Sequence, residues 1–149
     1  GVTVGCTAAK FCPDRKVTRA EMAAFLVRAL GLAATGQEDP FHDDDGHALE
    51  AQIAALHGSG ITTGCSILRY CPEQGITRAE MAAFLIRAFD LPPGEGANQF
   101  TDDDDHFFAS EIAALSASGI TSGCTATKFC PDRQLTRAEM AAFLVRALA

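Results

Sequence analysis

The chain has 149 residues, of which 48% are hydrophobic and 21% are charged, so it can bury the core of a domain of ordinary size. Its formal net charge of −7 argues against a nucleic-acid-binding protein, because affinity for phosphates comes mostly from basic residues. No apolar run is long enough to span a membrane, and no signal peptide is visible. Because the chain begins at Gly1 rather than Met, we expect a mature or excised piece.

The sequence repeats itself with a period of 59 residues. The motif Thr-Arg-Ala-Glu-Met-Ala-Ala-Phe-Leu starts at Thr18, Thr77 and Thr136. A fixed period of this kind is typical of stacked supersecondary units. The phase of the period predicts three units, which we call repeats one, two and three, at residues 1–33, 41–91 and 100–149. Repeat one contains only the second half of a unit.

Each complete repeat is predicted to form a helix, a loop and a second helix. The first helix of repeat two starts near Ala48, and it carries one apolar stripe with helical spacing, formed by Leu49, Ile53 and Leu56. A glycine follows this helix and is expected to end it, because glycine adopts a positive φ without steric strain. This residue is Gly60 in repeat two and Gly119 in repeat three.

The second helix of each repeat starts after the threonine of Thr-Arg-Ala-Glu. Its apolar face runs from Met22 to Leu30 in repeat one and returns in the other two repeats. Thr18 and Glu21 have the T-x-x-E spacing of a capping box, in which each side chain bonds the backbone N–H of the other residue. Three helices with equivalent faces are expected to pack together with pseudo-threefold symmetry. The sequence therefore predicts a mainly α fold.

The arginine of this motif is not explained by capping. Arg19, Arg78 and Arg137 fall at the first helical position, where the helix dipole disfavours a cation. Two interpretations stay open. In one, the arginine and the free N–H groups of the helix terminus bind an anion, since arginine holds a carboxylate through two hydrogen bonds. In the other, the arginine forms a solvated salt bridge with a neighbouring glutamate.

The six cysteines form three pairs with the spacing C-x5-C, namely Cys6/Cys12, Cys65/Cys71 and Cys124/Cys130. A zinc site would need further ligands at regular spacing nearby, and the sequence offers none. Local disulfides are therefore favoured over metal thiolates. Disulfides imply an oxidising compartment, outside the cell or at its surface.

Acidic runs, FHDDDGH and FTDDDDH, precede the first helix of repeats two and three. Helix capping and the helix dipole account for part of this charge, but three or four adjacent carboxylates repel and are the oxygen ligands that Ca²⁺ prefers. The sequence requires no cofactor, yet two sets are candidate calcium ligands: Asp43, Asp45 and Glu50, and Asp102, Asp104 and Glu111. His47 and His106 are expected to cap or pack rather than to bind metal.

The combined pattern F-x-D…H…I-x-x-L…G-I-T-x-G-C…F-C-P…T-R-A-E-M-A-x-F-L-x-R-A resembles the S-layer homology family over essentially the whole chain. The resemblance implies tandem motifs folded as a pseudo-trimer, with a central helical bundle and projecting helix-loop-helix prongs. It also implies non-covalent attachment to the bacterial envelope, often to cell-wall polysaccharide that carries pyruvate ketals. By motif position, the ligand-binding residues are Arg19, Arg78 and Arg137, with Gly60 and Gly119 lining the groove. The paired cysteines resemble a variant found in some branches of the family.

The sequence departs from this family in two places. The family usually has tryptophan after the histidine, where it contacts sugar, but Ala48 and Phe107 occupy these positions here. The first helix of repeat one is missing, so one prong and one groove are expected to be incomplete.

Two functions are consistent with these observations. The first is a non-catalytic module at the cell surface or in the cell wall, anchored by cell-wall polysaccharide. The alternative is a self-assembling extracellular structural protein, such as a subunit of an S-layer or filament, with calcium at its joints. An enzyme is not expected, because the histidine, aspartate and serine residues form no nucleophile–base arrangement.

Overall fold

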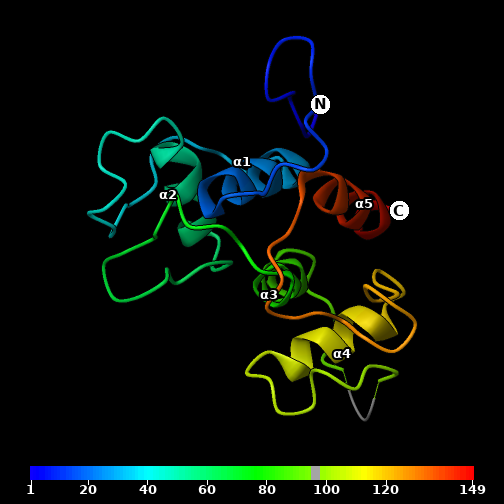
Figure 1. Ribbon diagram of the computed structural model, residues 1–149. Coiled ribbons are helices and arrows are strands. Elements are labelled where there is room, and N and C mark those ends of the chain that lie inside the picture. Colours follow the sequence, from blue (N-terminus) through cyan, green and yellow to red (C-terminus); the bar gives the residue numbers. More distant parts are fainter. Residues whose placement is uncertain (95–97) are drawn as a thin grey trace.

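The computed structural model describes residues 1–94 and 98–149 of the chain. They form five α-helices in the order α1 (Arg19–Leu30), α2 (Glu50–Gly58), α3 (Arg78–Ala88), α4 (Ala109–Ala117) and α5 (Arg137–Leu148) (Figure 1). The same residues contain isolated β-bridges but no sheet. The prediction of a mainly helical fold is confirmed. Among the helices described, none combines the length and the apolar character needed to cross a membrane.

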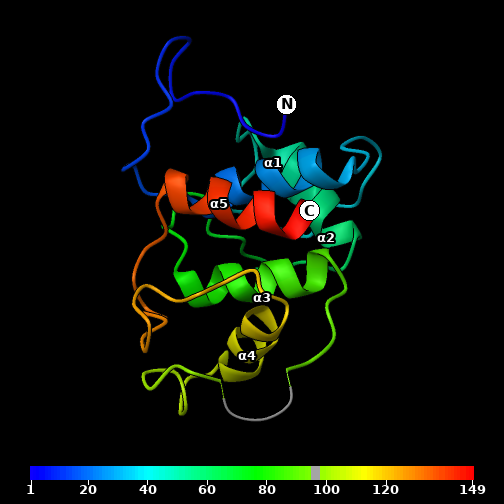
Figure 2. The ribbon, with the colours of Figure 1, turned by 90° about the vertical axis from the view of Figure 1, so that its right-hand side faces the viewer.

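The three helices that start at Thr-Arg-Ala-Glu gather in the middle of the molecule, and the other two lie outside them (Figures 1 and 2). Helix α2 packs on α1, and α4 packs on α3. The first helix of one repeat therefore covers the second helix of the preceding repeat. No other described helix packs on α5 to this extent. In consequence Val145 of α5 is 69% exposed, whereas its counterpart Val27 in α1 is 6% exposed.

Three backbone hydrogen bonds join the repeats at the centre of the fold. Val17 N–H donates to Leu135 O at 3.0 Å, Ile76 N–H donates to Val17 O at 3.0 Å, and Leu135 N–H donates to Ile76 O at 2.9 Å. The side chains of all three residues are fully buried. Because each of the three residues donates to one neighbouring repeat and accepts from the other, the repeats form a closed ring rather than an open row. The exact boundaries predicted for the repeats remain predictions.

The apolar face expected on the second helices is buried. Met22, Met81 and Met140, which follow the three Thr-Arg-Ala-Glu motifs, have no exposed surface. Ala23 and Ala82 beside them are also fully buried, as expected for small residues where packing is tight. The 3.6-residue period of the sequence therefore locates the core of this fold.

Candidate functional site

Each Thr-Arg-Ala-Glu motif begins its helix with a capping box. In α1, Glu21 N–H donates to Thr18 Oγ1 at 3.2 Å, and Thr18 N–H donates to Glu21 Oε2 at 3.0 Å. Both bonds recur at the starts of α3 and α5. The predicted capping role of these threonines and glutamates is confirmed, and such caps typically contribute ~1 kcal/mol.

The first N–H groups of these helices are bound by the following repeat. Arg19 N–H donates to Gln74 O at 2.9 Å, and Ala20 N–H donates to Pro72 O at 3.0 Å. Equivalent bonds join α3 to repeat three and α5 to repeat one. The expectation that the helix terminus offers free N–H groups to an anion is therefore wrong. A loop from the next repeat occupies the groups that a ligand would have used.

The arginine side chain is also held by the following repeat. Arg19 Nε donates to Tyr70 O at 2.8 Å, and Arg19 Nη1 lies 3.5 Å from Glu80 Oε1. The guanidinium carbon lies 5.0 Å from the ring centroid of Tyr70 and 5.5 Å from that of Phe84, within the range of cation–π attraction. Arg19 is only 4% exposed. The salt bridge of the second interpretation is therefore present, with Glu80 of the next repeat, but the arginine in it is buried rather than solvated.

The other two arginines repeat this arrangement around the ring. Arg78 Nε donates to Phe129 O at 2.7 Å, and Arg78 Nη1 donates to Glu139 Oε1 at 3.3 Å. Arg137 Nε donates to Phe11 O of repeat one at 2.9 Å. The unfavourable position of each arginine near the helix dipole is thus offset by a carbonyl, a carboxylate and two aromatic rings.

Burial and ion pairing shift the pKa values of the charged residues that join the repeats. Desolvation lowers the pKa of Arg78, and the Glu139 carboxylate opposes that shift. Desolvation raises the pKa of Glu139, but hydrogen bonding to Thr136 and the charges of Arg133 and Arg78 outweigh it, so the net pKa is lowered. Arg78 Nη2 is buried and has no hydrogen-bond partner within the described residues.

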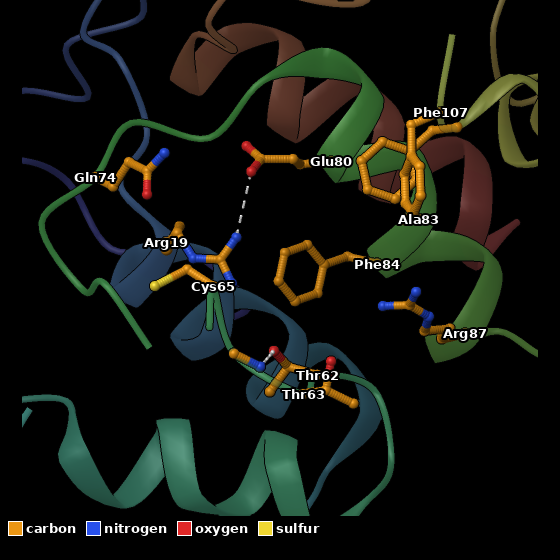
Figure 3. Close-up of a pocket in the computed structure, with 12 residues that line it drawn as sticks. Arg19, Thr62, Thr63, Cys65, Gln74, Glu80, Ala83, Phe84, Arg87 and Phe107 are labelled. Carbon is orange, nitrogen blue, oxygen red and sulfur yellow. Dashed lines mark hydrogen bonds and ion pairs between the residues drawn. The ribbon is translucent and has the colours of Figure 1, made fainter. Parts of the chain in front are cut away.

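A groove opens beside each buried arginine, and we name the three grooves after Arg19, Arg78 and Arg137. Their volumes are about 460, 230 and 220 Å³, respectively. In each groove the arginine of one repeat faces the second helix and the Gly-Cys loop of the next. In the Arg19 groove these residues are Gly64, Cys65, Glu80, Phe84 and Arg87 (Figure 3).

A second arginine lines each groove and was missed by the sequence analysis. Arg28, Arg87 and Arg146 lie in the last turns of α1, α3 and α5 and are exposed. They line the Arg137, Arg19 and Arg78 grooves, respectively. Figure 3 shows Arg19 and Arg87 on either side of Phe84. Their 59-residue spacing in the sequence was the available signal.

The three grooves differ in the wall that a third repeat contributes. In the Arg19 groove this wall includes Phe107, which is 88% exposed, and Phe108. In the Arg137 groove it is formed by Leu49. The described lining of the Arg78 groove includes no equivalent residue from repeat one. The Arg19 groove is therefore the largest of the three and carries an exposed aromatic ring.

The predicted groove glycines lie elsewhere. Gly60 and Gly119 follow α2 and α4 with a φ of +72° each, which confirms that they end these helices. They are not among the residues that line the grooves. Gly64 and Gly123, four residues further along, line the grooves instead. The helix has ended before the chain reaches the groove, so the glycine of the Gly-Cys loop takes that place.

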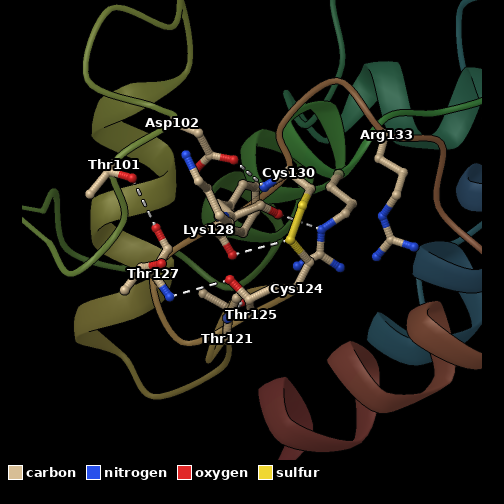
Figure 4. Close-up of a disulfide and its surroundings, with 12 residues drawn as sticks. Thr101, Asp102, Thr121, Cys124, Thr125, Thr127, Lys128, Cys130 and Arg133 are labelled. Carbon is tan, nitrogen blue, oxygen red and sulfur yellow. Dashed lines mark hydrogen bonds between the residues drawn. A yellow bond between two sulfur atoms is a disulfide. The ribbon is translucent and has the colours of Figure 1, made fainter.

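The acidic runs bind the disulfide loops rather than capping the helices. The carboxylate of Asp102 accepts from Phe129 N–H at 2.8 Å and from Cys130 N–H at 2.9 Å (Figure 4). Burial raises the pKa of Asp102, but backbone hydrogen bonds, these two foremost, and the charge of Lys128 outweigh it, so the net pKa is lowered. Asp43 makes the equivalent bonds in repeat two. Since these aspartates bond the loops, and the N-cap residues of α2 and α4 make no cap hydrogen bond with their own side chains, the capping interpretation of the acidic runs is wrong.

The histidines that follow these runs stay close to the helix starts. His47 Nδ1 accepts from Leu49 N–H at 3.0 Å, and His106 Nδ1 accepts from Phe108 N–H at 3.1 Å. Leu49 and Phe108 are the N-cap residues of α2 and α4. This geometry agrees with the expected capping role of the two histidines.

The two predicted sets of calcium ligands do not converge in the described residues. Asp45 and Asp104 are exposed, while Glu50 accepts from Gly46 N–H and Glu111 accepts from Ser110 Oγ, both at 2.8 Å. Within the described ranges, potential ligand atoms group in threes only at Asp43, Cys65 and Cys71, and those two sulfurs are bonded to each other. A calcium ion at either predicted set stays an untested prediction.

Three disulfides, Cys6–Cys12, Cys65–Cys71 and Cys124–Cys130, confirm the predicted pairing (Figure 4 shows the third). Each closes a loop of the same length, so replacing both cysteines of one loop with serine is expected to lower the free energy of unfolding by about 2 kcal/mol. Urea unfolding of the Cys124→Ser, Cys130→Ser variant measures this loss. The same replacement in repeat two serves as the matched variant, and a loss well below 1 kcal/mol in both would contradict the prediction.

Comparison with known proteins agrees with this organisation. Residues 99–141 match the family model described as the S-layer homology domain. The chain is 31% identical to an endoglucanase of Bacillus sp. (strain KSM-635) over 94% of the chain and 16% of that enzyme. It is 33% identical to an uncharacterized cell wall amidase of Bacillus anthracis, over 91% of the chain and 26% of the amidase. It is 30% identical to an S-layer protein of Bacillus thuringiensis subsp. finitimus, over 98% of the chain and 18% of that protein.

These matches run through almost the whole chain, whereas the chain spans only about a sixth to a quarter of each relative. The shared region is therefore the repeated module itself, which occurs in relatives whose names describe quite different proteins. Residues 99–141 thus form an S-layer homology domain, and the motifs of this region recur in repeats one and two.

Proposed function

We propose that this chain is a non-catalytic module that holds a protein at the bacterial envelope by binding an anionic cell-wall polysaccharide, such as one that carries pyruvate ketals. The family and the S-layer relatives indicate a location at the cell surface or in the cell wall. The observation that carries the proposal is the threefold occurrence of a buried and an exposed arginine in one groove. The named enzyme relatives are matched over a small part of their length, so their activities are not assigned to this chain.

The two arginines of a groove suit an anionic ligand in different ways. The buried arginine is held by the next repeat, so its charge is in position before a ligand arrives and little order is lost on binding. Arg87 and Arg146 each use Nη1 for a backbone carbonyl, that of Ile61 and of Ile120 respectively. The rest of each exposed guanidinium can bind a carboxylate through two hydrogen bonds. In the Arg78 groove, the unpartnered Nη2 of Arg78 is a further donor.

The aromatic side chains suit the less polar part of a sugar. Phe84 lies in the Arg19 groove between its two arginines, and Phe107 offers an almost fully exposed ring at the same groove. A binding site that combines apolar surface with a few charged groups is typical of small-ligand sites. Phe107 takes the position where the family usually has tryptophan, so we expect the Arg19 groove to contribute most of the affinity.

The exposed arginines provide the test, because their replacement leaves the buried ring intact. We expect the triple variant Arg28→Gln, Arg87→Gln, Arg146→Gln to bind purified cell-wall sacculi at least tenfold more weakly, the equivalent of ~1.4 kcal/mol. Cosedimentation over a range of sacculus concentrations measures the loss. Sacculi stripped of their polysaccharide are expected to bind neither protein.

The chain contains a matched control for this variant. Lys10, Arg69 and Lys128 occupy equivalent positions in the three disulfide loops, are exposed, and line none of the three grooves. Replacing all three with glutamine removes the same charge with the same threefold repetition. If both triple variants lost affinity equally, the loss would reflect net charge and the groove proposal would be wrong.

Self-assembly into an extracellular layer is a second candidate function, favoured by the S-layer proteins among the relatives and by the exposed Val145 and Leu148 of α5. It predicts polymers in the absence of any polysaccharide. Light scattering that shows a strict monomer, both with and without calcium, would count against it.

A further inference from the structure

A second kind of cavity lies beside the first helix of repeats two and three. In repeat two its volume is about 400 Å³, and its lining includes Gln37, Asp39, His47 and Glu50. The equivalent cavity of repeat three has a volume of about 270 Å³ and is lined by Asn98, Asp103, Asp104, Ala109 and Ser110, among others. With the 59-residue period, Asn98 replaces Asp39 and Ala109 replaces Glu50. Each cavity is lined by two carboxylates, from Asp39 and Glu50 in repeat two and from Asp103 and Asp104 in repeat three.

Repeat three shows how one oxygen of a buried aspartate is satisfied in this cavity, although the other oxygen, Asp103 Oδ1, has no hydrogen-bond partner in the described residues. Asp103 is 1% exposed, and its Oδ2 accepts from Asn98 Nδ2 at 2.8 Å. The other end of the same amide, Asn98 Oδ1, accepts from Phe100 N–H at 2.7 Å. Asn98 thus connects the backbone before the helix to the buried carboxylate with one acceptor and one donor.

Repeat two keeps the buried aspartate and the bond from the backbone before the helix, but it lacks the amide donor. Asp44, the counterpart of Asp103, is also 1% exposed. Asp39 Oδ1 accepts from Phe41 N–H at 3.0 Å, as Asn98 Oδ1 does from Phe100. Asp39 therefore offers a second carboxylate oxygen where Asn98 offers an N–H group. Asp39 Oδ2 and both carboxylate oxygens of Asp44 are buried without a hydrogen-bond partner in the described part of the chain.

The negative charges of Asp39 and Asp44 would be stabilised by a positively charged partner. Burial raises the pKa of Asp44 to about 6, and the negative charges of Asp39, Asp43 and Glu50 add to the shift. A buried charge without a partner is strongly unfavourable. One proton would neutralise only one of the two aspartates, whereas a hard cation with its waters would satisfy all the unpartnered oxygens and neutralise Glu50 as well.

We propose that Asp39, Asp44 and Glu50 of repeat two bind one hard divalent cation, with Ca²⁺ as the expected ion, and that repeat three does not. This set shares only Glu50 with the ligands predicted from the sequence. Asp43 is hydrogen-bonded to the disulfide loop, and Asp45 is exposed to solvent. In the described residues, the oxygens of these three carboxylates are not all close enough to one another to bind the same ion. At present Glu50 Oε2 accepts a hydrogen bond from Gly46 N–H at 2.8 Å. Cation binding is expected to break this bond and to move the Glu50 carboxylate towards the two aspartates.

The test compares thermal unfolding of the whole chain with and without Ca²⁺ at constant ionic strength and pH 7.5, after treatment with a chelator. For the wild-type chain, Ca²⁺ at about ten times its Kd is expected to raise Tm by about 3–5 °C. The Asp39→Asn variant copies the Asn98–Asp103 arrangement, so it is expected to fold and to lose this shift. Asp45→Asn removes the same charge from the exposed part of the run and is expected to keep it.

Three results would overturn the proposal. One is a wild-type Tm that does not respond to Ca²⁺ up to millimolar concentration. Another is a Ca²⁺ shift that disappears in Asp45→Asn but persists in Asp39→Asn, which would assign the ion to the exposed run. The third is a free energy of unfolding that falls as the pH rises through about 6 and does not respond to Ca²⁺. This result would show that Asp39 and Asp44 share a proton instead of a cation. A carboxyl group with a raised pKa stabilises the fold only while its proton is bound.

Discussion

Replacing Arg78 with alanine is expected to lower the free energy of unfolding by about 3–4 kcal/mol, a large part of the stability of a small domain. Arg78 is 2% exposed and lies between the rings of Phe129 and Phe143. Its removal leaves a cavity between them and deprives Phe129 O and the partly buried Glu139 of a donor. Urea unfolding followed by circular dichroism measures the loss.

Arg133→Ala is the control for this prediction, because Arg133 pairs with the same glutamate from an exposed position. The side chain of Arg133 is 44% exposed, against 3% for Arg78. Exposed ion pairs typically contribute up to about 1 kcal/mol, so this variant is expected to lose no more than that. Equal losses in the two variants would contradict the assignment of Arg78 as a connector between repeats.

The buried arginines Arg19, Arg78 and Arg137 hold the repeats together as well as lining the grooves. A chain that carries Arg78→Ala loses a contact between repeats two and three, so weaker binding to sacculi would not separate a ligand contact from a loosened groove. Arg87 and Arg146 avoid this problem, because each is exposed at the end of its helix. The buried arginines are better tested after the exposed ones.

Replacing Gly123 with alanine is the second change expected to have a large effect, about 3 kcal/mol. Gly123 has a φ of +88°, and a Cβ there would lie 2.5 Å from Lys128 O, Thr125 O and the ring of Phe100. The two carbonyls belong to the backbone of the disulfide loop, which cannot move without breaking its own hydrogen bonds. The cost of the positive φ and the cost of the overlap therefore add.

Gly119→Ala separates these two costs. Gly119 lies four residues earlier with a φ of +72°, but a Cβ there would meet nothing within 4 Å. Its replacement is expected to cost only the left-handed backbone conformation, ~1 kcal/mol. Chemical denaturation of both variants gives the difference, and a loss for Gly123→Ala no larger than for Gly119→Ala would show that the loop adapts to the extra carbon.

The sequence by itself determined the helical elements and most of the core. The capping boxes at Thr18, Thr77 and Thr136 depend only on residues three apart, and the buried face that follows depends on a spacing of three to four residues. The cysteine pairs lie close in sequence as well, so their spacing was enough to predict them. Each of these features depends on short-range geometry that a single chain segment carries within itself.

The partners of the arginines were decided only by the tertiary structure. Arg19 meets Tyr70 across 51 residues, and Arg137 meets Phe11 across 126. No local pattern shows that the next repeat fills the helix terminus, so the free N–H groups were predicted wrongly. The arginine does pair with a glutamate, but it is buried rather than solvated. The same holds for Asp44, whose missing donor is apparent only when its hydrogen bonding is compared with that of Asp103. Contacts between repeats depend on how the ring closes, and that closure is a property of the whole packed chain rather than of any one segment.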